Sequence, residues 1–106
     1  MERVPRLSLQ TLKVLRVFLE GYDANVRAEL AGADVMRRSG ISSGTTYPIL
    51  LRLEEQGLLA SHWEGDAPED LGRPRRRFYA LTSEGAHVAR SALSELAIHT
   101  FAPSEV

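Results

Sequence analysis

Four arginines crowd into one short stretch, and they are the side chains best suited to chemistry in this chain: Arg73, Arg75, Arg76 and Arg77. A guanidinium group binds phosphate or guanine through two parallel hydrogen bonds. Residues 61–72 carry four acids and no arginine or lysine, so the charge changes sign within one segment. Cations gathered beside a turn suit contact with a polyanion, and we expect that polyanion to be double-stranded DNA.

The overall composition narrows the remaining possibilities. The net charge is −1, whereas DNA-binding domains are usually strongly basic. The expectation of DNA binding therefore depends on the local cluster of arginines and not on the net charge. The chain has no cysteine, which excludes disulfides, thiolate metal ligands and cysteine nucleophiles. The 106 residues suit a single domain over 1–106. No apolar run is long enough for a membrane span or a signal peptide, so we expect a cytoplasmic protein without a membrane partner.

Other reactive residues lack the neighbours that catalysis or metal binding needs. The three histidines stand far apart, and none has a second ligand at metal spacing. Glu54 and Glu55 are adjacent, so their carboxylates diverge on a helix. Ser43 and Thr45 have no nearby histidine to act as a base. We therefore expect no catalytic residue, no metal site, no cofactor and no enzyme activity.

Hydrophobic periodicity predicts two helices in the first 40 residues. The first covers 8–20, where Ser8 suits the N-cap and Gly21 suits the end. The second covers 32–39. The residues between the two helices read as a turn, a loop or a short turn of helix.

A third helix is predicted over 44–56, and its two faces differ in chemistry. Four residues recur with helical period and are expected inside: Thr46, Ile49, Leu50 and Leu53. The proline of this helix lacks an amide hydrogen, so we expect it in the first turn, where that hydrogen has no partner. The outward face carries Ser43, Thr45, Tyr47, Pro48, Leu51 and Arg52. Its hydroxyl, phenol and guanidinium groups reach phosphates and base edges in a major groove.

A hairpin and a last helix complete the predicted fold. Strand-like residues at both ends of 59–81 predict two antiparallel strands joined by a long loop, the wing. A helix capped by Thr82 follows over 83–101. The expected fold class is mainly α with a small two-stranded antiparallel β-hairpin, which is the plan of a winged helix-turn-helix with residues 44–56 as its recognition helix.

The arginines cannot all point the same way, because side chains alternate along a strand. We expect Arg73 and Arg75 to touch phosphate, since they lie nearest the tip of the wing, and Arg77 to be next. Arg76 is expected to pair with an acid such as Glu64.

The helix over 83–101 carries more apolar surface than one small core can cover, so we expect a second copy of the chain to cover it. The expected contacts of this homodimer come from the first and last helices: Leu9, Leu12, Ala86, Ala89, Leu93 and Leu96.

Several linked motifs make the chain resemble the PadR-like transcriptional regulators over residues 8–97. In order, the motifs are Ser43-Gly44-Thr45-Thr46-Tyr47-Pro48-Ile49-Leu50, Arg52-Leu53-Glu54, Gly57-Leu58-Leu59, Gly72-Arg73-Pro74, Arg76-Arg77-Phe78-Tyr79 and Leu81-Thr82-Ser83-Glu84-Gly85. The resemblance implies a winged helix-turn-helix, a homodimer joined through the terminal helices, and usually repression at palindromic operator DNA. The sequence departs from the family pattern at Thr46, where leucine is usual, at Ala80, where a basic residue is frequent, and in its single, short C-terminal helix.

Two alternatives stay open at this level. A winged helix can also serve as a protein-interaction module or an anti-repressor that does not bind DNA, and the arginines would then pair with the four preceding acids. Trp63 fits packing at the base of the hairpin, and it also fits the wall of a pocket for an aromatic small-molecule effector.

Overall fold

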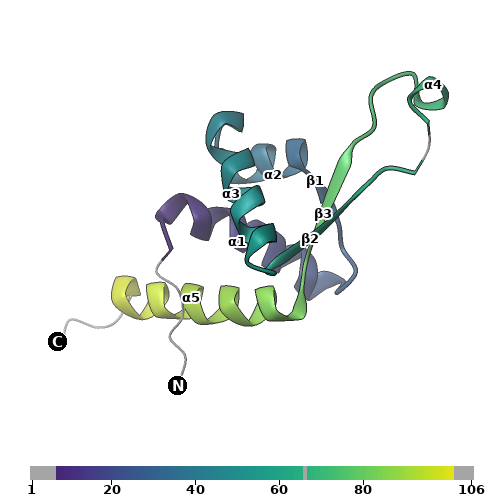
Figure 1. The fold of residues 1–106 in the computed structure, drawn as a ribbon. Coiled ribbons are helices and arrows are strands. Elements are labelled where there is room, and N and C mark those ends of the chain that lie inside the picture. Colours follow the sequence, from purple (N-terminus) through teal and green to yellow (C-terminus); the bar gives the residue numbers. More distant parts are fainter. Residues whose placement is uncertain (1–6, 66, 102–106) are drawn as a thin grey trace.

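Five helices and three short strands follow one another in the computed structural model, which describes residues 7–65 and 67–101 (Figure 1). The fold is mainly α with a small antiparallel sheet, and no helix in the described ranges is long and apolar enough to cross a bilayer. The elements are α1 (Leu9–Ala24), β1 (Leu30–Ala31), α2 (Gly32–Ser39), α3 (Ser43–Glu55), β2 (Leu59–Trp63), α4 (Pro68–Leu71), β3 (Arg77–Leu81) and α5 (Ser83–Phe101).

Helix α1 runs one turn further than the sequence predicts. The Ser8 hydroxyl accepts a hydrogen bond from the N–H of Thr11 at 3.1 Å and so caps the helix. Gly21, the predicted end, stays helical, and its carbonyl accepts from the N–H of Asn25 at 2.9 Å. A glycine ends a helix when it adopts a left-handed conformation. Gly40 does so at the end of α2, with φ of 75°, whereas Gly21 does not, so the predicted end of the first helix is wrong.

The predicted antiparallel hairpin is present as β2 and β3, and β1 adds a third strand, which the sequence did not predict, in the order β1-β3-β2. Strand β1 consists of Leu30 and Ala31, which are buried and pair with Tyr79 and Phe78 of β3. Strand β3 begins at Arg77, so the two preceding arginines lie before the strand. The long loop between β2 and β3 contains the short helix α4 and projects from the body of the molecule (Figure 1).

Helix α3 packs its predicted inner face into the core: Thr46, Ile49, Leu50 and Leu53 are buried. The Thr46 hydroxyl donates to the carbonyl of Ile41 at 3.2 Å, which ties the start of the helix to the preceding turn. The helix begins at Ser43, so Pro48 lies in the second turn rather than the first. A proline there leaves the carbonyl of Gly44 without its helical partner, and the exposed position of Gly44 leaves that carbonyl to solvent.

Helix α5 packs against α1 through small residues. Ala86 and Ala89 are buried in the core of this chain, so the prediction that they contact a second subunit is wrong. An ion pair between Arg90 and Asp23 joins the two helices. At the start of α5, the Thr82 hydroxyl accepts from the N–H of Gly85 and donates to the carbonyl of Gly57, so the helix is fixed to the end of α3.

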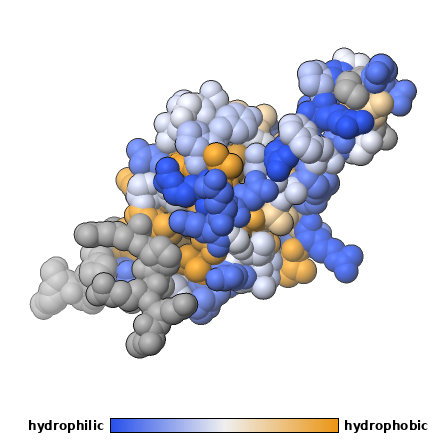
Figure 2. Space-filling model, in the orientation of Figure 1, coloured by the Kyte–Doolittle hydropathy of each residue, from blue (hydrophilic) through white to orange (hydrophobic). Residues whose placement is uncertain are grey.

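Polar side chains cover most of the projecting loop, whereas apolar and polar side chains both reach the surface of the body (Figure 2).

Candidate nucleic-acid interface

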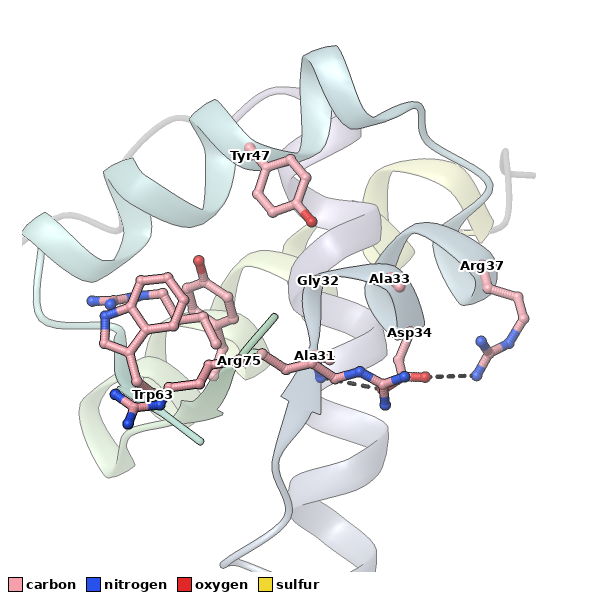
Figure 3. Close-up of a pocket in the computed structure, with 11 residues that line it drawn as sticks. Ala31, Gly32, Ala33, Asp34, Arg37, Tyr47, Trp63 and Arg75 are labelled. Carbon is pink, nitrogen blue, oxygen red and sulfur yellow. Dashed lines mark hydrogen bonds and ion pairs between the residues drawn. The ribbon is translucent and has the colours of Figure 1, made fainter. Parts of the chain in front are cut away.

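A groove of about 590 Å³ lies between α2, α3 and the hairpin. It brings together three of the predicted residues, Tyr47, Arg75 and Arg77. The other five do not line it: Ser43, Thr45, Pro48, Arg52 and Arg73. Tyr47 comes from α3, while Trp63, Arg75, Arg76 and Arg77 come from the hairpin. Figure 3 shows Tyr47 above the start of α2, with Trp63 and Arg75 on the side of the hairpin. One exposed residue of α3 and three arginines of the hairpin therefore border the same groove.

The residues predicted on the outer face of α3 are all exposed: Ser43, Thr45, Tyr47, Pro48 and Arg52. The side chain of Arg52 forms no hydrogen bond or ion pair with any residue that the structure describes. The Tyr47 side chain, 47% exposed, leans over Gly32, where a Cβ atom would lie 2.7 Å from its hydroxyl oxygen. The missing side chain of Gly32 thus makes room for Tyr47 beside the start of α2.

Arg73 is held by a carboxylate. Its two terminal nitrogens donate to the two carboxylate oxygens of Glu64, at 2.8 and 3.0 Å. This hydrogen-bonded pair lowers the pKa of Glu64 to about 2 and raises the pKa of Arg73. Glu64 also accepts from the backbone N–H of Arg76 at 3.1 Å. The predicted partner of Glu64 is thereby corrected, because the acid pairs with the side chain of Arg73 and takes only the backbone of Arg76.

Arg77 lies between a carboxylate and an aromatic ring. One terminal nitrogen lies 3.4 Å from a carboxylate oxygen of Glu54 at the end of α3, and that oxygen also accepts from the Ser61 hydroxyl. The guanidinium carbon lies 5.0 Å from the centre of the Trp63 ring, a cation–π arrangement. Burial raises the pKa of the neighbouring Tyr79. Arg77 therefore joins the base of the hairpin to the end of α3, and its side chain is only partly exposed.

Arg75 and Arg76 are both exposed and line the groove. Within the part of the chain that the structure describes, the side chain of Arg76 forms no hydrogen bond or ion pair. Arg73 and Arg77 thus pair with carboxylates, and Arg77 also lines the groove beside Arg75 and Arg76.

Sequence comparison assigns the family. The sequence model of the transcriptional regulator PadR-like family matches residues 19–91. The chain belongs to this family. Among curated proteins, none matches its sequence.

Three solved structures share the fold of this PadR-like protein. A PadR family transcriptional regulator from Eggerthella lenta is 28% identical, with a TM-score of 0.61, over 81% of this chain and 72% of that one. NadR in complex with 4-hydroxyphenylacetate is 22% identical, with a TM-score of 0.65, over 88% of this chain. The complex of Staphylococcus aureus MepR with DNA is 14% identical, with a TM-score of 0.64, over 90% and 68% of the two chains. The PadR-like chain spans only 57% of the NadR chain.

Sequence reasoning missed two features of this PadR-like interface. Asp34, which lines the groove, accepts from the N–H of Ala31 and pairs with Arg37 at 2.8 Å, and these contacts lower its pKa. The spacing of three residues between Asp34 and Arg37 is the helical signal that could have revealed the pair. The close approach of Tyr47 to Gly32 has no local signal, because the two residues belong to different helices.

Proposed function

We propose that this PadR-like regulator binds double-stranded DNA as a homodimer and represses transcription at a palindromic operator. Helix α3 enters the major groove with Ser43, Thr45, Tyr47, Pro48 and Arg52, and the wing arginines lie against flanking phosphates. The two-fold axis of the dimer places two such helices on half-sites about 10 base pairs apart, or a multiple of that.

One observation supports this proposal above the others: Tyr47 on the exposed face of α3 lines the same groove as Arg75, Arg76 and Arg77 of the hairpin. A duplex presents base edges and phosphates side by side, so a protein that reads both needs both surfaces on one face. The MepR–DNA complex, which shares the fold, supports this choice of partner. The net charge of −1 does not oppose it, because Arg75, Arg76 and Arg77 gather at one groove.

The ion pairs of Arg73 and Arg77 are compatible with phosphate binding. Both guanidinium groups are about one-third exposed. The single contact of Arg77 with Glu54 at 3.4 Å is a surface ion pair of the kind that contributes little to stability, so a phosphate can replace that carboxylate at small cost. The bidentate pair of Arg73 with Glu64 costs more to open, and the release of counterions from the duplex offsets part of that cost. We assign phosphate contacts to Arg75, Arg76 and Arg77, which line the groove, and to Arg73 beside them at the wing.

The test is selection of duplexes from a random DNA pool, at low and at near-physiological salt. We expect a palindromic motif, and the logarithm of affinity should fall linearly with the logarithm of salt concentration. The double variant Arg73→Ala, Arg75→Ala should reduce that slope by about 0.9 for each phosphate that the protein no longer neutralises. The variant Lys13→Ala, at an exposed residue of α1, is the control and should keep the slope. An unchanged slope in the double variant would remove the assignment of these arginines.

The second candidate is a protein-interaction module. The pairing of Arg73 with Glu64 favours it, because an acid of the wing holds one arginine of the cluster. A pool that yields no enriched motif at either salt concentration would favour this candidate over DNA binding.

A further inference from the structure

Leu51 lies on the outward face of α3, the proposed recognition helix. It is 58% exposed, although it is one of the larger apolar side chains of the domain. Residues two apart on an α-helix are rotated by about 200°, so Leu51 points almost directly away from Leu53, which is 1% exposed and packs in the core. Leu51 is therefore central to the face that enters the major groove in the proposed function, on which this inference rests.

The neighbours of Leu51 on that face limit how the helix can meet DNA. Pro48 and Tyr47 precede it by three and four residues, lie on the same side of the helix and are exposed. Glu55 follows by four residues, also exposed, and its carboxylate repels phosphates. The half of α3 before Glu55 is thus the half that can approach a duplex, and its centre is apolar.

An isobutyl group cannot form hydrogen bonds with base edges. Against the amino, carbonyl or ring nitrogen groups of the major groove, it would remove water without replacing the hydrogen bonds of that water. The 5-methyl group of thymine is the apolar group that standard DNA presents there. We propose that Leu51, supported by Pro48, contacts a thymine methyl group in each half-site and thereby selects thymine at that position.

The experiment replaces the thymines of a selected duplex, one at a time, by deoxyuridine. This change removes the methyl group and keeps all base-pairing and groove hydrogen bonds. For the unmodified protein we expect binding to weaken about fourfold at one position per half-site, which corresponds to one buried methyl group. At the same position, 5-methylcytosine in place of cytosine should recover part of the affinity that a cytosine substitution loses.

Variants assign this effect to the side chain. Leu51→Ala should bind the thymine duplex more weakly and should respond less than twofold to deoxyuridine at that position. Arg52→Ala, the matched control on the same face, should lose affinity but keep the fourfold response. Leu51→Gln is the second variant if Leu51→Ala folds poorly by circular dichroism, and it should also lose the response.

The outcomes separate this inference from the proposed function. If a motif is selected but no deoxyuridine position weakens binding, the inference is wrong and DNA binding stands. If Leu51→Ala keeps the full response, another residue contacts the methyl group, and the inference is wrong as well. If no duplex is selected at all, the proposed function fails, and the inference fails with it.

Discussion

Gly32 and Tyr47 form a contact between α2 and α3 that depends on the absence of a side chain. A Cβ atom at position 32 would lie 2.7 to 3.0 Å from three atoms at the end of the Tyr47 side chain. The tyrosine can move away, because it is half exposed and rotates about its own side-chain bonds. Position 32 therefore controls where Tyr47 lies on the recognition surface.

We expect Gly32→Ala to displace Tyr47 and to couple energetically with it. The free energies of unfolding of Gly32→Ala, Tyr47→Ala and the double variant, measured by denaturant titration, should deviate from additivity by about 0.5 kcal/mol or more. In the Tyr47→Ala background, Gly32→Ala should cost less than in the wild type, since the three atoms nearest to the new Cβ atom are removed and alanine is the better helix former. Additive values would show that the ring does not occupy this space.

The single tryptophan of the chain, Trp63, reports on the base of the hairpin. Its ring is 56% exposed, and the guanidinium of Arg77 lies over it. We expect Arg77→Ala to change the fluorescence spectrum of Trp63 and to cost about 0.5–1 kcal/mol of stability, because the cation–π interaction is removed. Arg38→Ala, an exposed arginine of α2 outside the groove, is the control and should leave the spectrum unchanged. If the Trp63 spectrum of Arg77→Ala equals that of the wild type and of Arg38→Ala, the cation–π arrangement is wrong.

At the scale of the element, the start of α5 has no room for a side chain. A Cβ atom at Gly85 would lie 2.1 Å from the carbonyl oxygen of Leu58, which is backbone and cannot rotate away. We expect Gly85→Ala to destabilise the fold by about 1–3 kcal/mol in thermal or denaturant unfolding, because α5 must move away from the end of α3. The matched control is Gly44→Ala.

Gly44 is also in the first turn of a helix, but nothing lies within 4 Å of a Cβ atom there. Alanine at this position should be neutral or stabilise by up to about 1 kcal/mol. If the two variants lose similar amounts of stability, the loss in Gly85→Ala comes from replacing a glycine in the first turn of a helix and not from the collision with the Leu58 carbonyl.

A second link between elements depends on pH. His62 of β2 contacts Glu29, the residue before β1, at 2.6 Å, and this hydrogen bond raises the pKa of the imidazole above 6.5. The stabilisation is complete below pH 6.5 and is lost as the pH rises through the raised pKa. Histidine ring signals in an NMR titration should give a high pKa for His62, and Glu29→Gln should return it toward 6.5. An unchanged pKa in that variant would contradict the pairing.

The elements that sequence could predict are those with a periodic local signal. The four inner residues of α3 follow the 3.6-residue period and are buried, because each helical turn meets the same core. Strand β1 has only two residues, too few for a pattern, and forms because Tyr79 and Phe78 of β3 come alongside it. The partners of the arginines were not predictable for a similar reason: the folding of the hairpin and α3 brings Glu64 to Arg73 and Glu54 to Arg77.

At the scale of the whole molecule, the proposed homodimer depends on apolar side chains that the fold leaves uncovered. Leu9 and Leu96 are 57% and 37% exposed, and Leu12 and Leu93 are partly buried. The start of α1 and the end of α5 lie on the same side of the molecule (Figure 1). With Ala86 and Ala89 in the core, the four leucines are the remaining predicted contacts, and they can form one patch.

We expect light scattering to give about twice the 11.7 kDa mass of the chain at micromolar concentration. The double variant Leu9→Glu, Leu96→Glu should shift the mass to that of one chain, since a charge in an apolar interface loses its hydration without gaining a partner. Val26→Glu is the control, because Val26 is 64% exposed and lies in the loop after α1. It should remain dimeric. If the double variant keeps the mass of a dimer and selects DNA with the same half-site spacing as the wild type, the interface lies elsewhere. If the double variant is a monomer that still binds a single half-site, the leucines serve assembly and α3 serves recognition.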